Sequence, residues 1–279
     1  MKSNEMNEKN KTDSGKKRKK SRWFSAGLVI VLSFFVALAI YFYVFGNPDN
    51  FIGGDRNNLP LQGNMLGVFY KGGFVIPIIL SMLLSVIVLS IERLIAISRS
   101  KGKGDLTAFV ANIKERLEVE DIQGARDLCS KQKGSVAAVI NSGLDMYELM
   151  LHDTSELTKE QRAANISMKI EEATALELPM MNQNLPVIAT FSNLGTLTGL
   201  FGTVMGMIRS FSALGGSGGT DSAALSVGIS EALVNTAFGI LTGACAIISY
   251  NYFAAKIDNI IYAIDEIGFS IVNVYQSKY

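Results

Sequence analysis

The sequence has little charge and few of the residues that build metal centres or disulfides. Only 18% of its 279 residues are Asp, Glu, Lys or Arg, whereas soluble domains average about 25%. It holds two cysteines, Cys129 and Cys245, and a single histidine, His152. We place one cysteine in the cytoplasm and the other in the membrane, so we expect no disulfide between them, and they show no metal-ligand spacing. We expect His152 to be an ordinary surface residue. We therefore expect no metal and no other cofactor.

The sequence also lacks the patterns that mark a catalytic centre. It has no glycine-rich phosphate loop, no nucleophile next to a base and no acidic metal cluster, which argues against an enzyme. There is no internal repeat of apolar segments and no charged site in the middle of one, which argues against a solute carrier. The basic run at 16–22 precedes no globular domain, so it does not indicate a nucleic-acid partner.

What the sequence does have is apolar residues, at 48% of the chain with a mean hydropathy of +0.26. They gather in four segments, 23–45, 74–97, 185–211 and 228–253. Each is long enough to cross a bilayer as one helix, for which about 20 residues suffice. The pattern predicts an all-α integral membrane bundle with four spanning helices.

Positive charges beside these segments predict their orientation. The run KKRKKSR precedes the first span, and Arg99, Lys101 and Lys103 follow the second. Because Lys and Arg next to a span stay cytoplasmic, we expect both termini in the cytoplasm. The first span has no polar stripe, and its apolar run is too long for a cleaved signal peptide. We expect it to be a retained anchor at the lipid-facing periphery.

The segments between the spans are expected to differ in kind. Two outer loops, 46–73 and 212–227, are short, and the first ends in a turn of interfacial helix. The region 98–184 reads as amphipathic helices, too sparsely apolar for an enzyme domain; we expect a cytoplasmic stalk that continues directly into the third span. The basic tail 1–22 is expected to be disordered, and 254–279 to pack on the stalk through a heptad-like seam. The seam residues are Ile257, Ile260, Ile264, Ile267, Ile271 and Val274.

The third span carries a line of hydroxyls beside a line of glycines. Thr196, Thr203 and Ser210 recur every seven residues, so they lie on one face of a helix. Glycines at this spacing let a second helix approach closely. They are Gly195, Gly199, Gly202 and Gly206. We therefore place this helix inside a bundle, where it packs tightly and offers hydroxyl oxygens to a polar group.

The fourth span has a matching polar side. Its small-residue face consists of Ala232, Thr236, Gly239 and Gly243. Because polar side chains in a membrane usually face a cavity or a partner, Thr203 and Thr236 are predicted to form a polar seam, although a purely local bond to a carbonyl one turn back stays open for Thr203. Glu231 is either an interfacial carboxylate in water or a contact at the mouth of a polar path. Asn235, one turn on, is expected to bridge Glu231 to another chain.

Two linked motifs carry a resemblance to a known family. GLFGTVMGMIRSF (199–211) is followed, after one loop, by GISEALVNTAFG (228–239). This pair of motifs resembles the MotA, TolQ and ExbB family of proton-channel subunits, and its residues are most similar to those of ExbB. Asn251, in SYNYF, matches a further family position. The resemblance covers roughly residues 70–275.

The resemblance implies a subunit of the bacterial inner membrane that forms a ring, usually a homopentamer, through its spanning helices. It implies that the ring encloses two copies of an ExbD-like partner carrying a protonatable aspartate, transports H⁺ and drives a TonB-like protein. By this resemblance Thr203 and Thr236 line the ion path. Contact with the partner or a neighbouring subunit is implied for Glu231, Asn235, Asn251, Gly199, Gly202, Gly206, Gly239 and Gly243.

The sequence departs from the family pattern in two places. The family's proline before the Gly-Leu-Phe-Gly-Thr motif is replaced here by Thr196, which we also place on the ion path. The segment 23–45 is extra to the usual three-span ExbB plan. Other interpretations stay open: a TolQ-like envelope subunit or motility stator of the same family, or, in another class, a structural membrane scaffold without an ion path.

Overall fold

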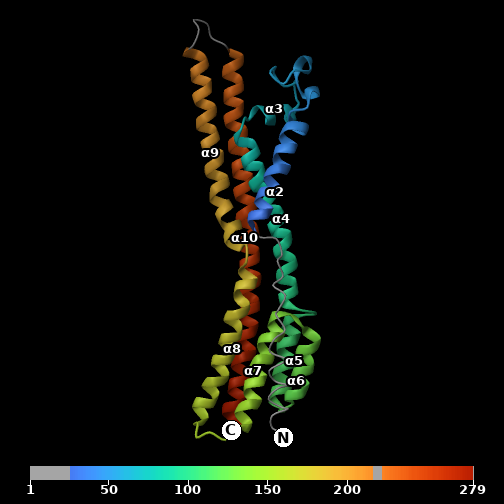
Figure 1. Cartoon of the computed structure of the whole chain (residues 1–279), viewed down its shortest axis with the longest axis vertical. Coiled ribbons are helices and arrows are strands. Elements are labelled where there is room, and N and C mark those ends of the chain that lie inside the picture. Colours follow the sequence, from blue (N-terminus) through green and yellow to red (C-terminus); the bar gives the residue numbers. More distant parts are fainter. Residues whose placement is uncertain (1–25, 216–221, 279) are drawn as a thin grey trace, which may run out of the picture.

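The computed structural model describes residues 26–215 and 222–278 and is helical almost throughout (Figure 1). These residues contain no β-strand; a single bridge pairs Phe51 with Pro60. The helices run along one long axis, so the molecule is elongated. The all-α prediction is confirmed.

Four helices are long and apolar enough to cross a membrane. They are α2 (Ala26–Ala39) with its continuation η1 (Ile40–Phe45), α4 (Val75–Lys101), α9 (Leu185–Gly215) and α10 (Ser222–Lys278). They coincide with the four predicted spans and support a multi-pass membrane protein. The start of the first predicted span and the basic tail 1–22 lie outside the described residues.

Helix α10 is the axis of the molecule. It is one helix of 57 residues, which is about 85 Å long at 1.5 Å per residue. Its first half lies beside α9, and its second half runs into the group of shorter helices at the other end (Figure 1). The predicted tail is therefore, over its described residues 254–278, the continuation of the last span.

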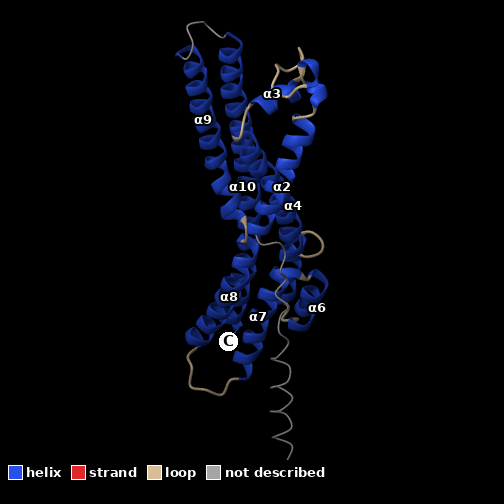
Figure 2. Ribbon diagram, turned by 45° about the horizontal axis from the view of Figure 1, so that its top comes forward, coloured by secondary structure: helices blue, strands red, loops and turns tan. Residues whose placement is uncertain are grey.

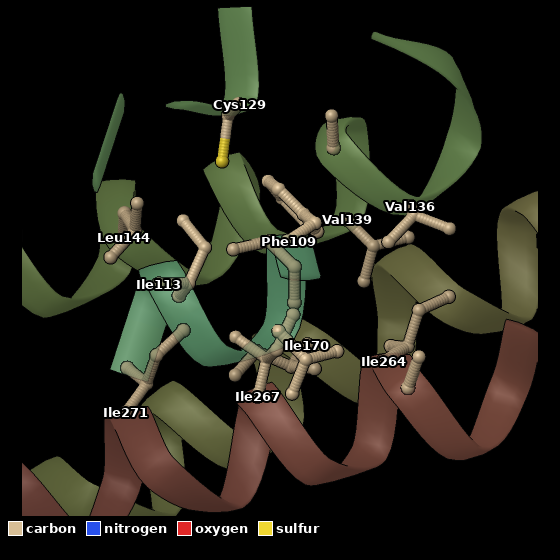
Figure 3. Close-up of a cluster of buried hydrophobic side chains, with 14 of the residues drawn as sticks. Phe109, Ile113, Cys129, Val136, Val139, Leu144, Ile170, Ile264, Ile267 and Ile271 are labelled. Atoms are coloured by element: carbon tan, nitrogen blue, oxygen red, sulfur yellow. The ribbon is translucent and has the colours of Figure 1, made fainter. Parts of the chain in front are cut away.

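The shorter helices form a stalk around the second half of α10. They are α5 (Leu106–Glu118), α6 (Ile122–Gln132), α7 (Gly134–His152) and α8 (Lys159–Asn182). Side chains from α5, α7, α8 and α10 meet in one core (Figure 3), which is the largest of the buried apolar clusters. Residues 98–184 do not build this core alone, because α10 supplies one side of it.

The single histidine and the two cysteines behave as expected. His152 is exposed at the end of α7, and both cysteines are free. Cys129 lies in the stalk core, where burial raises the pKa of its thiol to about 11. A thiol with so high a pKa carries almost no thiolate at neutral pH, so Cys129 is a core residue and not a reactive one.

The heptad-like seam of the α10 tail is confirmed for its isoleucines and corrected at its end. All five isoleucines are at most 2% exposed. Val274 is only partly buried, and Tyr275 takes the last seam position at 1% exposure. Tyr275 lies four residues after Ile271, and its hydroxyl donates a hydrogen bond to the Met150 carbonyl at 3.3 Å. The last step of the seam is therefore four residues instead of three.

The stalk does not flow directly into the third span, as the sequence had led us to expect. Helix α8 ends at Asn182 and α9 begins at Leu185. Asn184, between them, has a φ of +64°, which is a left-handed conformation that breaks a helix. The stalk and the span are thus joined by an elbow.

A buried ion pair on α4 holds this elbow. Glu92 and Arg93 are 9% and 1% exposed, and Arg93 Nε donates to Glu92 Oε2 at 2.6 Å. Arg93 Nη1 also donates to the carbonyls of Met180 and Met181, at 3.2 Å each, which are among the last carbonyls of α8. Asn184 Nδ2 donates to Glu92 Oε2 at 3.2 Å. The pair therefore fixes the end of α8 and the start of α9 to α4.

We expect Arg93→Met to destabilise the protein strongly, because it leaves the Glu92 carboxylate buried without its partner. Breaking one side of a buried pair costs about 3–5 kcal/mol, whereas replacing both sides by apolar residues is often neutral. Thermal unfolding in mild detergent should show a lowered midpoint for Arg93→Met and recovery in Glu92→Met/Arg93→Met. If the double variant is as unstable as the single one, charge pairing is not what holds the elbow.

Residues 46–73, predicted as a loop, form an ordered unit that we call the loop cap (Figure 2). It contains η2 (Pro48–Asn50), η3 (Ile52–Gly54) and α3 (Met65–Lys71), and α3 confirms the expected turn of helix. Asn50 is buried; its Nδ2 donates to the carbonyls of Val44 and Phe45 at 2.9 Å each, and its Oδ1 accepts from Asn64 Nδ2 at 2.9 Å. The cap is thereby tied to the end of η1.

The second predicted loop, 212–227, is mostly helix. Helix α9 continues to Gly215, and α10 begins at Ser222. Ala, Leu and Ser dominate both flanks of this segment, and Ala and Leu are strong helix formers. The tip, 216–221, lies outside the described residues.

Candidate functional site

Helices α9 and α10 touch backbone to backbone along their glycines. A Cβ atom built on Gly239 would lie 2.7 Å from the Cα of Gly199 and 2.8 Å from the Gly195 carbonyl oxygen. A Cβ on Gly206 would lie 2.8 Å from the Gly228 carbonyl oxygen. Real side chains do not fit at such distances, so only glycine permits this approach. We call this line of contact the glycine seam.

The glycines that were predicted to contact a partner or another subunit all lie in this seam. Gly202 lies against the side chain of Asn235, and Gly243 against the Ser192 carbonyl and the Thr196 hydroxyl. Packing between two helices of one chain therefore already fills these faces. Contact of the same glycines with a second chain stays a prediction.

Thr203 and Thr236 meet in the glycine seam, as their positions in the two spans predicted. Their hydroxyl oxygens are in hydrogen-bond contact, and both side chains are half-buried. The Thr203 hydroxyl has one hydrogen, which it can donate to the Gly199 carbonyl at 3.2 Å or to the Ala232 carbonyl at 3.3 Å. Thr236 Oγ1 reaches the same Ala232 carbonyl at 3.3 Å. The bond from Thr203 to the carbonyl one turn back is therefore compatible with the contact between the two hydroxyls. The Ala232 carbonyl lies within hydrogen-bond distance of both hydroxyls.

The other two hydroxyls of the predicted line also face α10. Ser210 is fully buried, and its hydroxyl can donate to Gly206 at 3.1 Å or Leu225 at 3.4 Å. Thr196 is exposed; it bonds to the Ser192 carbonyl at 3.3 Å and lies beside Gly243. The line of hydroxyls thus follows the glycine seam along its length.

Glu231 is not an interfacial carboxylate in water, which was one of its two interpretations. Its side chain is only 4% exposed, and its Oε1 accepts a hydrogen bond from Arg209 Nη1 at 2.5 Å. The Arg209 side chain is 47% exposed, and its guanidinium carbon lies 5.8 Å from the Phe74 ring centroid. Sequence reasoning missed Arg209 as the partner, although it is the only charge between Leu185 and Gly215. A charge isolated in an apolar span was the signal.

Asn235 is wholly buried inside its own chain, and its bridge from Glu231 to another chain stays a prediction. Neither its Oδ1 nor its Nδ2 has a hydrogen-bond partner among the described residues. Leaving a buried polar group without a partner costs about 1–3 kcal/mol. Asn235 therefore does not stabilise the fold through hydrogen bonds to it. Asn251, by contrast, is exposed on α10, and its contact with a partner stays a prediction.

We expect Asn235→Leu to leave stability unchanged or to raise it, because the change removes two polar atoms that bond to nothing in the fold. The matched control is Asn50→Leu, since Asn50 is also buried but uses both ends of its amide. Midpoints of thermal unfolding in detergent should fall for the control alone. An equal fall for Asn235→Leu would mean that its amide has a partner in the folded protein.

The helices and the glycine seam together define a multi-pass membrane protein whose last two spans form a tightly packed polar contact. Residues 131–266 match the MotA/TolQ/ExbB proton channel family, so the chain contains a domain of that family. The match covers the stalk from α7 onward and the α9–α10 pair. The first span, the loop cap and α4 lie outside it.

Individual relatives agree with this match. The chain is 28% identical to the biopolymer transport protein ExbB of Pseudomonas putida over 56% of its own length and 46% of the relative. It is 28% identical to ExbB of Salmonella typhimurium over 52% of its length and 62% of the relative. The chain is 33% identical to the Tol-Pal system protein TolQ of Pseudomonas aeruginosa over 34% of its length and 42% of the relative. The chain spans about half the length of the ExbB relatives it matches.

Proposed function

We propose that this protein is an ExbB-like subunit of a proton-driven motor. It forms a pentameric ring with its own copies in the bacterial inner membrane, with both termini in the cytoplasm. The ring surrounds two ExbD-like helices and uses the proton motive force to energise TonB-dependent outer-membrane transport. The observation that carries this proposal is the Thr203–Thr236 hydroxyl pair in the glycine seam, together with the family domain that contains it.

The charges of α9 and α10 support a path that needs a second chain. Between Leu185 and Gly215, and between Ser222 and Phe253, the only charged residues are Arg209 and Glu231, and these two pair with each other. Hydroxyls donate and accept hydrogen bonds without carrying a fixed charge. They therefore suit a path in which a carboxylate of the partner carries the proton past Thr203 and Thr236. Each proton yields about 2.3 kcal/mol per 100 mV of membrane potential.

The depth of the threonine pair fits a short outer access. Thr203 is six residues from Arg209, or about 9 Å along α9, and eighteen residues from Leu185, or about 27 Å. The pair therefore lies closer to the end of the spans that carries the loop cap than to the stalk. A proton entering from the cap side would meet the hydroxyls early and leave through the longer stalk side.

Exposed apolar faces on the same helices support assembly with other chains and with lipid. Leu197, Leu200 and Val204 of α9 are 58%, 58% and 52% exposed, and Leu233 and Ile248 of α10 are 66% and 69% exposed. Apolar area of this extent is stable only against lipid or another protein surface. These exposed faces of α9 and α10 are therefore available for contact with the adjacent subunits of a ring and with lipid.

A TolQ-like envelope role is the second candidate, because TolQ is also among the similar proteins. A motility stator receives less support. The charged run 114–127 could form a ridge for a rotor, but Lys114 pairs with Glu266 at 2.5 Å and Arg116 with Asp121 at 2.9 Å. Those charges are engaged within the chain.

Co-purification from native membranes in mild detergent, followed by native mass determination, tests the proposal. We expect several copies of this chain with a substoichiometric small protein that has one spanning helix and a membrane aspartate. The identity of that protein separates the ExbB role from the TolQ role. A monomer, or a complex with an unrelated transporter, would contradict the proposal.

A further inference from the structure

We propose that the first span positions the Glu231–Arg209 pair: Tyr41, at the end of that span, fixes the loop cap so that Gly73 closes over the pair. The relevance of this inference to ion transport rests on the proposed function, but the contacts that position the pair do not depend on ion flow. The first span and the cap lie outside the residues that match the family domain. They are therefore a feature of this chain that the domain alone does not explain.

The first span reaches α10 at the level of the ion pair. Its last turns pack into one buried cluster with α4 and α10, in which Ala37, Tyr41 and Phe45 meet Ile76 and Val234. Val234 follows Glu231 by three residues, which is less than one helical turn. The end of the first span thus packs against α10 within one helical turn of Glu231.

Tyr41 points into the protein and Tyr43 points outward, because residues two apart lie on nearly opposite faces of a helix. Tyr41 is 9% exposed, whereas Tyr43, two residues on, is 80% exposed. A π-helix adds a residue to each turn and often occurs at functional positions. Within the π-helix η1, the Tyr41 ring stacks on that of Tyr70, with the centroids 4.8 Å apart.

One carbonyl oxygen links Tyr41 to Gly73. The Tyr41 hydroxyl donates to the Tyr70 carbonyl at 3.0 Å, and the Gly73 N–H donates to the same oxygen at 3.2 Å. Because both donors share this acceptor, the position of the Gly73 backbone depends on where Tyr41 holds Tyr70. The first span therefore sets the position of the turn between α3 and α4.

Gly73 lies directly against the ion pair. A Cβ built on it would be 2.5 Å from Glu231 Oε1 and 3.1 Å from Arg209 Nη1, and its φ is +74°. Only glycine fits both this left-handed conformation and this contact. The Gly73 backbone thus covers the carboxylate, which explains how an acid near the end of a span is almost fully buried.

The loop cap is held on its other sides as well. The Phe69 ring meets the Phe238 ring of α10 edge-on, with centroids 4.9 Å apart. Asn50 ties the cap to the carbonyls of η1. With these anchors in place, loss of the Tyr41 hydroxyl is expected to loosen the cover over Glu231 without detaching the cap.

The test compares Tyr41→Phe with Tyr43→Phe in the full chain, in native membranes. Tyr41→Phe keeps the stacked ring and removes only the hydroxyl, while the Tyr43 change alters an exposed tyrosine of the same helix. The probe is a water-soluble carbodiimide with an amine nucleophile, and the readout is the labelled fraction of Glu231 measured by peptide mass. We expect wild type and Tyr43→Phe to label equally little. Tyr41→Phe should label roughly two- to tenfold more, as loss of one hydrogen bond predicts.

Gly73→Ala provides a second variant, because its methyl group displaces Glu231 directly and should also raise labelling. Equal labelling of Tyr41→Phe and wild type would overturn the inference, as would equal increases in Tyr41→Phe and Tyr43→Phe. Failure of the proposed function is distinguishable. If labelling rises as expected but replacing the Thr203–Thr236 pair leaves energised transport normal, the positioning role stands and the ion path falls.

Discussion

Thr203→Val and Thr236→Val are each expected to abolish the energised transport while leaving the complex assembled. Valine has nearly the shape of threonine but neither donates nor accepts a hydrogen bond, and it cannot solvate a carboxylate or relay a proton. The two hydroxyls contact each other, so removing either one breaks the pair. Transport measured in cells should fall to the level of a strain that lacks the chain.

Thr190→Val is the matched control for these variants. Thr190 lies on the same helix, is exposed, and its hydroxyl bonds only to the Pro186 carbonyl among the described residues, at 2.8 Å. Transport should be normal in this variant, and all three variants should co-purify with the same partners. Normal transport in both Thr203→Val and Thr236→Val would favour the scaffold interpretation over the motor.

Gly239→Val is expected to separate α9 from α10 and to destabilise the protein. Its side chain would meet backbone atoms of Gly199 and Gly195 within 2.8 Å, and backbone cannot rotate away as a side chain can. Overpacking a core costs about 1–3 kcal/mol and occasionally more. We expect a strongly lowered midpoint of thermal unfolding in detergent, together with loss of transport.

Gly27→Val serves as the control for the glycine prediction. Gly27 is also helical, in α2, but nothing lies within 4 Å of a Cβ built on it. Its substitution should change the free energy of unfolding by no more than about 0.5 kcal/mol, as surface changes usually do. A wild-type midpoint for Gly239→Val would mean that the backbones are farther apart than the structure shows.

Periodic patterns in the sequence predicted much of this architecture. Long apolar runs predicted the four spans, because their length must match a bilayer. The seven-residue spacing of Thr196, Thr203 and Ser210 predicted one helix face, because helical geometry alone decides it. The three- and four-residue spacing of the isoleucines in the α10 tail predicted their burial for the same reason. These features depend on positions within a single helix.

Features that depend on the register between elements were not predictable from one sequence. The pairing of Arg209 with Glu231 requires α9 and α10 to align at one level, and the closure of Gly73 over them requires a third element. The elbow at Asn184 depends on a contact with Glu92, far away in the chain. The loop cap is rich in Gly, Asn and Pro, so its composition resembles that of an irregular loop although it is ordered.

The most direct test of the account is proton flux through the purified native complex in proteoliposomes, with wild type compared with Thr203→Val/Thr236→Val. A pH-sensitive dye inside the vesicles would report flux under an imposed potential. The account predicts measurable flux for wild type and background flux for the double variant, with equal amounts of assembled complex. Equal flux in the two would contradict the claim that the hydroxyl pair in the glycine seam lines the ion path.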